Sequence, residues 1–357
     1  MRSFVTEPTP EKIQIGFLTP LTGNPLCGKY MTQGLELAKQ NYPSLFTNYE
    51  FLIEDTQFKP TEAVTAARKL IEIDQVYYII GPCGSSSVLA VAPLAEANHV
   101  LLFTSTAFAE SISDAGDYIF RAATTASDET PVLSQFIADT YPSNKTGLIY
   151  LDNDAGISYR QLLTQQLPSL GNPVVLSEAA AIPETDFRTV LSKMHSREVE
   201  VLILATLVPQ SIAIKRQAAE MGLSFVFVTA GISSENSDYL DTLGNLAEDT
   251  YTVSMLDFSD ATLTTNIEAR RFFQSYEKHY PEDIPTRDTV QTYVTTLLLL
   301  RALERCGDTV DCVQQELYSL KNEQTALGTI SITSQGDIKY PSLFMKQVQN
   351  GSFVKVE

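Results

Sequence analysis

The sequence predicts an α/β protein with two doubly wound, parallel-sheet (Rossmann-like) lobes. Short apolar runs alternate with amphipathic helices through residues 12–108, and the same alternation starts again after residue 128 and continues to about residue 229. From about residue 257 the chain turns mainly helical and carries no strands of its own until residue 329. Those helices are expected to cover one of the earlier sheets, which makes at least one domain discontinuous in sequence.

Length and charge narrow the class of protein. A chain of 357 residues fits two domains of ordinary size. The chain carries 25 basic against 43 acidic residues, a net charge of −18, and no cluster of Lys and Arg stands out. Nucleic acid and anionic membrane surfaces are therefore excluded as expected partners. No apolar run reaches the length that crosses a bilayer.

The first α/β run follows from periodicity. Apolar runs predict strands at 12–18, 49–54, 76–80 and 100–103. Helical spacing predicts helices between them, around 31–38, 61–73 and 88–95, with Pro60 at a helix start. Because strands and helices alternate, the sheet is expected to be parallel with helices on both faces.

The second run repeats this design. An extended stretch at 118–123 leads into it, and strands are expected at 146–151, 174–177, 199–205, 225–229 and 250–256. Helices are expected at 131–141, 158–167, 187–194 and 210–221, and then, in the final third, at 268–279, 288–305 and 310–320. Strands return at 329–333, 342–349 and 353–356.

One strand–turn–helix stretch, Ile79–Ser87 (IIGPCGSSS), has the features of a binding turn. Three serines follow a Gly-Pro turn and begin a helix, where free backbone N–H groups point outward. The turn can hold a carboxylate or another electron-rich group. The serines can equally well only cap the helix, and from this stretch alone capping is the more ordinary interpretation.

The sequence contains no motif that is typical of a catalytic site or a metal site. The sequence has no G-x-S-x-G, no H-E-x-x-H and no phosphate loop, and its three histidines fall at predicted helix ends or exposed faces. The loop Cys306–Cys312 suits a local disulfide better than a metal site, since no second Cys/His pair lies nearby. We expect no enzyme activity, no cofactor and no metal.

The first ten residues differ from the rest. Residues 1–10 are polar and lack the apolar core of a signal peptide, and they resemble a flexible leader or linker. A targeting segment is therefore expected to be absent from this sequence.

An ordered set of motifs resembles a known family. The matching stretches include Ile13–Gly23 (IQIGFLTPLTG), Glu54–Thr56, Ile79–Ser87, Ala115–Arg121 (AGDYIFR) and Thr333–Asp337 (TSQGD). Together they span nearly the whole chain and resemble the type I periplasmic solute-binding proteins, specifically the leucine/isoleucine/valine-binding branch that serves ABC importers.

This resemblance implies two lobes joined by a three-strand hinge, with ligand held in the cleft between them. The crossings are expected near residues 121–125, 253–257 and 330–333. The implied division assigns 11–122 plus 257–328 to the first lobe and 123–256 plus 329–357 to the second, after the leader 1–10. Ligands of open parallel sheets bind beyond the carboxyl ends of the strands, where this chain carries Ser85-Ser86, Ser105-Thr106 and Asp154.

The resemblance also implies individual ligand contacts. Ser85 occupies the place of the serine that holds the ligand carboxylate in amino-acid-binding relatives. The family's next anchor is a threonine, and at that point either Thr106 supplies the hydroxyl and Phe108 an apolar wall, or Phe108 is buried scaffold. The remaining positions that match family contacts are Cys27, Leu207 and Gly231.

The expected ligand class follows from a missing charge. The acidic partner of a ligand ammonium group should fall near Gly231, yet residues 229–233 contain no carboxylate. Because an unpaired buried charge costs several kcal/mol, a carboxylate or amide with a sizeable apolar or aromatic body is expected. Alternatively, Asp154 or Glu235 supplies the counter-charge and a branched-chain amino acid binds.

Two cysteines adjoin the expected pocket. Cys27 and Cys83 are either free thiols or a disulfide, and the disulfide is favoured because exported proteins commonly oxidise paired thiols.

The function implied by the resemblance is capture of a small ligand and its delivery to the permease subunits of an ABC transporter. The protein is expected to be a monomer, periplasmic or lipid-anchored on the outer face of the cytoplasmic membrane. A ligand-sensing regulatory or receptor module of the same fold is the alternative. Importer genes beside this one would favour transport.

Overall fold

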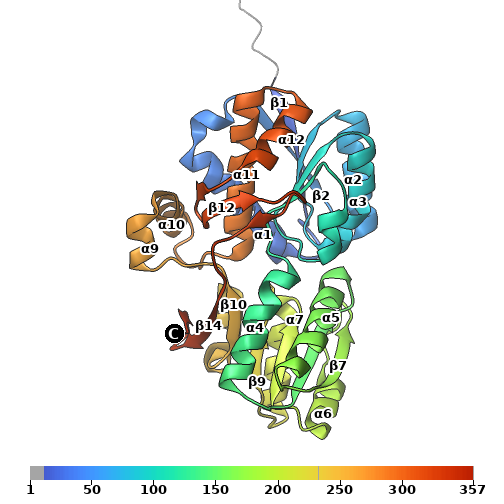
Figure 1. The fold of residues 1–357 in the computed structure, drawn as a ribbon, viewed down its shortest axis with the longest axis vertical. Helices are drawn as coiled ribbons and strands as arrows, with labels where there is room; N and C mark the ends of the chain where they lie inside the picture. Colours follow the sequence, from blue (N-terminus) through green and yellow to red (C-terminus); the bar gives the residue numbers. More distant parts are fainter. Residues whose placement is uncertain (1–11, 232, 357) are drawn as a thin grey trace, which may run out of the picture.

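The structure, a computed structural model, describes residues 12–231 and 233–356, and the expected leader at 1–10 lies outside them. The described chain forms two α/β lobes stacked end to end (Figure 1). Each lobe is built on one mainly parallel sheet with helices on both faces. The predicted fold class is therefore confirmed. Within the described residues, no helix combines the length and the apolar composition needed to cross a membrane.

The first-lobe sheet has five parallel strands in the order β2-β1-β3-β4-β5. Its strands are β1 (Ile13–Thr19), β2 (Tyr49–Asp55), β3 (Tyr78–Ile80), β4 (Leu101–Thr104) and β5 (Ile119–Arg121). The four residues of β4 and the three residues of both β3 and β5 are all buried. Continuous apolar runs are expected of parallel strands that are covered on both faces.

Two sets of helices cover this sheet. One face packs on α2 (Pro60–Arg68), its continuation η2 (Lys69–Ile73) and α3 (Ser85–Ala97). The other face packs on α1 (Pro25–Asn41) and on helices from late in the chain. The late helices in that core are α10 (Ile267–His279), α11 (Arg287–Cys306) and α12 (Val310–Ser319). The short helix α9 (Asp260–Thr265) lies against α10.

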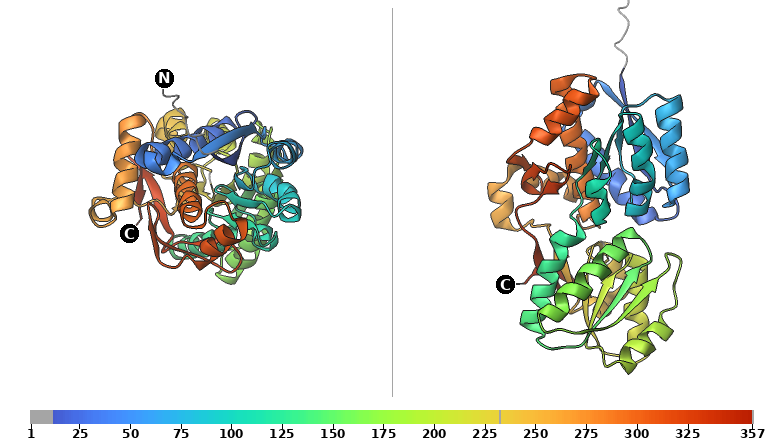
Figure 2. Two further views of the ribbon diagram at one scale, coloured as in Figure 1. Left: turned by 90° about the horizontal axis from the view of Figure 1, so that it is seen from above. Right: turned by 45° about the vertical axis from the view of Figure 1, so that its right-hand side comes forward.

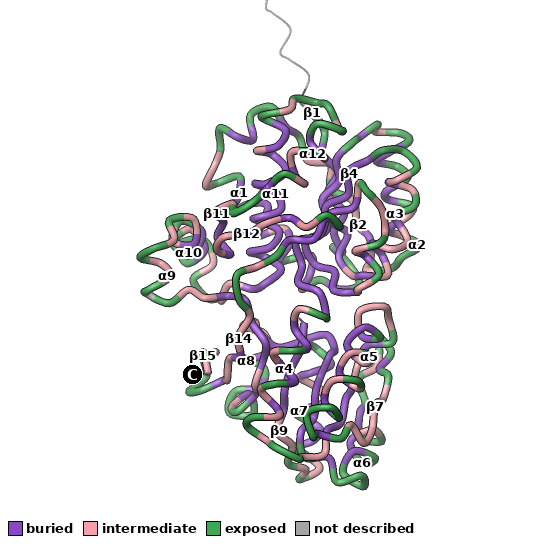
Figure 3. Tube along the Cα trace, viewed as in Figure 1, coloured by how far each residue is buried: buried purple, intermediate pink, exposed green. Residues whose placement is uncertain are grey.

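Helix α11 is the centre of that second layer. It is buried along most of its length (Figure 3). It lies against α1 and shares with it a core that includes Met31, Leu35 and Leu299. The prediction that late helices cover an earlier sheet is confirmed for α11.

The second-lobe sheet has seven strands in the order β15-β14-β10-β9-β8-β6-β7. The parallel strands are β6 (Thr146–Leu151), β7 (Val174–Ala180), β8 (Val201–Ala205), β9 (Val226–Thr229) and β10 (Tyr251–Ser254). The antiparallel hairpin of β14 (Phe344–Gln349) and β15 (Ser352–Lys355) extends one edge.

Helices cover both faces of this sheet as well. The core on one face includes residues of α4 (Ala126–Thr140) and α5 (Asp154–Ser169). The core on the other includes residues of α6 (Arg188–Ser196) and α7 (Val208–Glu220). The remaining short elements are α8 (Ser237–Leu243), η1 (Pro43–Phe46), η3 (Glu110–Asp114) and η4 (Gly244–Ala247).

A third, small sheet differs from the sequence-based division. It pairs β11 (Glu323–Thr325), β12 (Gly328–Ile332) and β13 (Ile338–Lys339) in antiparallel fashion. Ile330, Ile332 and Ile338 belong to the first-lobe core, although residues 329–357 were assigned to the second lobe. The apolar side chains of β12 and β13 complete the layer around α11, so we propose that the third crossing follows Lys339 instead of lying at 330–333.

Three segments then link the lobes, at 122–125, 255–259 and 340–343, and they lie on one side of the molecule (Figure 2). Arg121 and Asp337 form an ion pair close to the points where two of these segments begin. The Nε of Arg121 donates to Asp337 at 2.8 Å, and the pair is buried between β5 and the turn before β13. Both residues come from the motifs that carry the family resemblance.

Candidate ligand-binding cleft

Two adjoining hollows lie between the lobes, beyond the carboxyl ends of the strands. We call the first the Ser85 compartment. It takes residues from the turns after β3, β4, β6, β8 and β9. The described residues that line it include no charged side chain, and aromatic and aliphatic side chains from both lobes form much of its wall, among them Phe58, Phe108, Leu151, Tyr159 and Leu207.

The position of Ser85 depends on Gly84. Gly84 precedes α3 with a φ of +89°, and a Cβ there would lie 2.9 Å from the ring of Phe58. Glycine therefore lets the chain turn sharply into the helix beside the aromatic wall. No side chain caps α3, and Gly84 and Ser85 at its start line the compartment, so uncapped N–H groups of the first turn are available there.

The hydroxyl of Ser85 is oriented by two backbone amides. Its Oγ accepts hydrogen bonds from the N–H of Phe108 at 3.0 Å and of Ala109 at 3.1 Å. Because both lone pairs of the hydroxyl oxygen are occupied, its proton remains to be donated. A buried O–H at an uncapped helix N-terminus is suited to a carboxylate or carbonyl oxygen.

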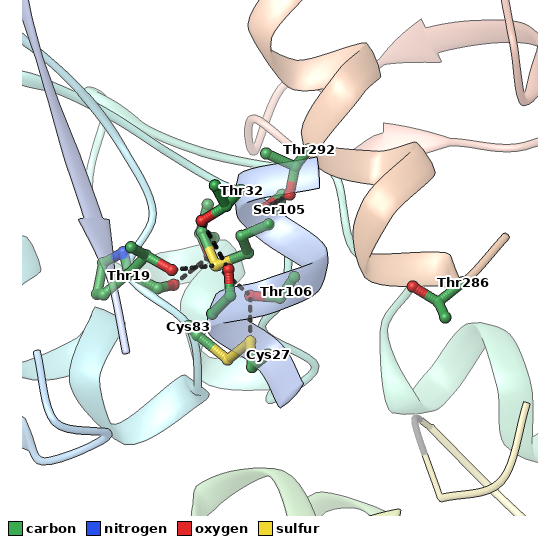
Figure 4. The surroundings of a disulfide bond; sticks show 12 residues. Thr19, Cys27, Thr32, Cys83, Ser105, Thr106, Thr286 and Thr292 are labelled. Atoms are coloured by element: carbon green, nitrogen blue, oxygen red, sulfur yellow. Dashed lines mark hydrogen bonds between the residues drawn. A yellow bond between two sulfur atoms is a disulfide. The ribbon is translucent and has the colours of Figure 1, made fainter. Parts of the chain in front are cut away.

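Thr106 lies on the same wall, beside a disulfide (Figure 4). Cys27, on the first turn of α1, is joined to Cys83, in the turn before α3. The Oγ1 of Thr106 is 3.9 Å from the Sγ of Cys27 and 3.9 Å from the Sδ of Met31. Sulfur is a weak acceptor, so a ligand oxygen would compete well for this hydroxyl.

The second hollow is the Asp288 compartment, which also takes residues from both lobes. From the first lobe it is lined by Asn24, Leu26, Cys27, Tyr30, Thr286, Arg287 and Asp288, and from the second by Leu207, Val208, Pro209, Gly231, Glu235 and Asn236. Leu207 and Gly231 also line the Ser85 compartment, so the two hollows meet at these residues.

Arg287 is held in a buried network between the lobes. Its guanidinium pairs with Glu129 on α4 and donates to the carbonyl oxygen of Val253 at 2.9 Å. Glu129 also accepts from the Tyr159 hydroxyl at 2.8 Å and from the N–H of Gly231 at 2.9 Å. Burial, the largest single effect, acts to lower the pKa of Arg287, but the acidic groups around it, Glu129 first among them, together outweigh burial and raise that pKa. Arg287 therefore keeps its positive charge, and the negative charge of Glu129 compensates it.

The two acidic residues of the Asp288 compartment differ in their partners. Glu235 pairs with Lys346 at 2.6 Å and accepts from the Ser254 hydroxyl at 2.7 Å. Asp288 is 3 % exposed, and its Oδ1 finds no hydrogen-bond partner among the described residues. Burial raises the pKa of Asp288 to about 7, against a smaller opposing effect of Arg287.

Six of the nine predicted site residues line these hollows: Cys27, Ser85, Thr106, Phe108, Leu207 and Gly231. Phe108 forms part of the wall while its N–H supports Ser85, and its contact with a ligand stays a prediction.

The other three predicted residues have different surroundings. The Ser86 hydroxyl donates to Asp154 at 2.5 Å, a bond that joins α3 of the first lobe to α5 of the second. Ser105 is buried and turned toward Thr292 on α11, at 2.8 Å between the two hydroxyl oxygens (Figure 4). None of the three is among the residues that line the two hollows.

Sequence reasoning missed Tyr30, Tyr159, Arg287 and Asp288. The two charged residues begin α11, a helix that was interpreted only as cover for the first sheet. The available signal was an Arg-Asp pair at the start of a long helix whose following turns are apolar or carry only hydroxyl and amide groups. Charges rarely begin a buried helix unless they are paired or functional.

Further contacts cross between the lobes. The hydroxyl of Tyr30 donates to Asp238 at 2.9 Å, and the N–H of Ile284 donates to Ser237 at 2.9 Å. The structure therefore shows the lobes closed upon each other. Two doubly wound lobes, three linking segments and an enclosed cleft define the class of proteins that bind a ligand by closing around it.

Comparison with known proteins names the family. The chain belongs to the periplasmic binding protein family, whose model matches residues 12–352. The family resemblance inferred from the sequence is thereby confirmed, and the family is extracytoplasmic.

Relatives and solved structures of this family cover nearly the whole chain. A "Leu/Ile/Val-binding protein homolog 3" of Brucella melitensis is 22% identical over 97% of this chain and 94% of its own. A leucine binding protein of Thermotoga maritima superposes with a TM-score of 0.88 at 22% identity, covering 97% of this chain and 98% of its own. A solute binding protein of Rhodopseudomonas palustris in complex with 3,4-dihydroxybenzoic acid gives 0.87 at 20% identity, covering 97% and 96%. At these identities the likeness of the structures shows the fold.

Proposed function

We propose that the protein captures a small carboxylate or amide in the cleft and delivers it to the permease subunits of an ABC importer. It acts as a monomer, in the periplasm or anchored by lipid at the outer face of the cytoplasmic membrane. Its work is binding and release by hinge motion, without chemistry on the ligand.

The observation that carries this proposal is the Ser85 hydroxyl. Two backbone amides occupy its lone pairs, which leaves its proton directed to a ligand acceptor at the uncapped start of α3. The remaining wall of the Ser85 compartment is uncharged and rich in aromatic and aliphatic groups. One end of the ligand therefore carries an acceptor oxygen, and an apolar or aromatic body follows it.

Ser85→Ala tests the proposal. A thermal-shift screen of leucine, isoleucine, valine, benzoate, 3,4-dihydroxybenzoate and their amides first selects the best-stabilising compound, because ligand that binds only the folded state raises the melting temperature. Calorimetry then compares the wild type, Ser85→Ala and the exposed control Ser192→Ala. Loss of a hydrogen bond to a charged group corresponds to about a ten- to hundredfold loss of affinity.

The control variant should bind like the wild type. Unchanged affinity in Ser85→Ala, or a screen in which no carboxylate or amide stabilises the protein, would contradict the proposal.

A further inference from the structure

We propose that Asp288 makes its compartment a specificity site for a cationic nitrogen that the ligand carries at a distance from its carboxylate. The ligand class is an ω-amino or ω-guanidino carboxylate. This inference rests on the proposed function, because it takes the carboxylate of the same ligand to lie beside Ser85.

The charge balance of the compartment leaves one group uncompensated. Arg287 is neutralised by Glu129, and Glu235 by Lys346. Within the described residues Asp288 has no such partner, since its one charged neighbour in sequence, Arg287, is already paired. The compartment therefore carries about one negative charge without a counter-ion when Asp288 is ionised.

An uncompensated buried carboxylate is unfavourable for the folded protein. A charge that is removed from water and left unpaired either destabilises the fold or takes up a proton. The raised pKa of Asp288 reflects this burial. A ligand cation would balance this charge. Its electrostatic attraction to Asp288 would be strong, because the site is otherwise shielded from water.

The two compartments offer the two ends of one elongated ligand separate places. They meet at Leu207 and Gly231, and the disulfide contributes Cys27 to one wall and Cys83 to the other. The Ser85 compartment has no charged lining residue among those described, whereas the Asp288 compartment has three. A ligand that spans both therefore meets hydrogen-bond donors at one end and an anion at the other.

A structural role of Asp288 makes a different prediction. Asp288 is the second residue of α11, and an acidic group in the first turn stabilises a helix through its dipole. Capping is already supplied by Thr286, which accepts from the N–H of Thr289 at 3.3 Å. If the dipole were the reason for Asp288, its replacement would lower stability and leave ligand preference unchanged.

The experiment uses matched ligand pairs on Asp288→Asn. Linear ω-amino and ω-guanidino carboxylates with three to six carbons are compared with the analogues that lack the terminal nitrogen, by thermal shift and calorimetry at pH 8. The matched control is Asp283→Asn, which removes an acidic residue that is paired with Lys29 at 2.6 Å and lies outside both compartments.

In the wild type and in Asp283→Asn, at least one nitrogen-bearing ligand should bind about ten- to hundredfold more tightly than its analogue. In Asp288→Asn that advantage should disappear, while the analogue keeps its affinity within about threefold and the ligand-free protein is at least as stable as the wild type.

Two outcomes would overturn the inference: no nitrogen-bearing ligand exceeds its analogue, or the advantage persists in Asp288→Asn. The proposed function fails separately, by Ser85→Ala leaving the affinity for carboxylates unchanged. If carboxylates bind through Ser85 without any preference for a distal nitrogen, the function stands and the role of Asp288 falls.

Discussion

Two buried polar side chains of the cleft, Ser85 and Asp288, differ in how far their hydrogen-bonding capacity is already used within the protein. The oxygen of Ser85 is fully used by the amides of Phe108 and Ala109, so the residue is satisfied as an acceptor and open only as a donor. Asp288 instead keeps an acceptor oxygen that has no partner in the described part of the chain. The first arrangement costs the folded protein little, whereas the second lowers its stability.

The pH dependence of stability should expose the cost at Asp288. Its pKa is about 7 in the fold, against an ordinary carboxyl value near ~4 in the unfolded chain. The folded protein therefore holds more protons than the unfolded chain between these values, so stability falls as pH rises through this window and the loss is complete above about pH 8. Asp288→Asn should show a flatter profile of melting temperature from pH 5 to 8.

Other titrating groups have to be separated from this effect. Arg287, Tyr30 and Glu235 line the same compartment, and the three histidines are exposed elsewhere. Arg287 stays charged, and burial keeps Tyr30 neutral by raising its pKa. The informative quantity is thus the difference between wild-type and variant profiles. Parallel profiles would show that Asp288 does not titrate in this range.

At the scale of single residues, the sequence predicted the positions of those cleft residues that directly follow the carboxyl ends of strands. Ser85, Leu207 and Gly231 could be placed because parallel strands bring their carboxyl ends to one edge. Arg287 could not, since its pairing with Glu129 joins residues far apart in sequence and on different lobes. Such a pairing leaves no local periodicity to detect.

Among the elements, α3 depends on a covalent brace. The Cys27–Cys83 disulfide ties the start of α1 to the turn before α3, and it holds together two walls of the cleft. The second disulfide, Cys306–Cys312, closes only the short connection between α11 and α12. The structure thus joins both pairs of cysteines that the sequence offered.

Removing the two disulfides should have unequal effects. The Cys27–Cys83 bridge spans a sequence separation of 56, against 6 for Cys306–Cys312. In the loop-entropy view these contribute about 4 and about 2 kcal/mol to the free energy of unfolding. Denaturant unfolding of the two double-serine variants checks this order.

Ligand affinity should fall only for Cys27→Ser/Cys83→Ser, because this pair adjoins both compartments. The Cys306→Ser/Cys312→Ser variant is the matched control. Equal affinity in both variants would show that the brace does not shape the cleft.

Prediction of the elements was correct where periodicity was long and failed where a short strand joined a core formed elsewhere. Helix α11 and the parallel strands could be anticipated from apolar spacing. Strand β12 could be recognised as a strand, but its lobe could not, because Ile330 and Ile332 fit either sheet until α11 is in place. Side-chain pattern shows that a face is buried, and not which partner buries it.

The whole molecule is held closed by a small set of polar contacts. The bonds from Ser86 to Asp154 and from Tyr30 to Asp238 join the lobes near the cleft, and the buried Arg287–Glu129 pair joins them beneath it. A ligand that contacts both lobes adds to these contacts, so its apparent affinity depends on how often the empty protein closes.

Weakening two of these contacts should shift the molecule toward an open form. Ser86→Ala/Asp238→Ala removes one partner from each bond without altering a residue that lines either compartment. We expect about a tenfold loss of ligand affinity and a larger radius of gyration of the ligand-free protein in small-angle scattering. Asp241→Ala, at an exposed position of the same helix α8, is the control. Unchanged affinity and size would show that the two bonds do not govern closure.

The discontinuous first lobe also has a consequence for how this chain is made. Strands β1 to β5 are synthesised before residue 122, yet α11, which buries one face of their sheet together with α1, begins only at Arg287. Most of the second lobe, from α4 to β10, is contiguous and emerges in between. The lobe that is synthesised first is therefore completed last, and until α11 follows, the apolar face that carries Ile15, Phe17 and Tyr78 lacks the larger part of its helical cover. A nascent chain whose apolar face stays incompletely covered is prone to aggregate, which is the condition that chaperones counteract.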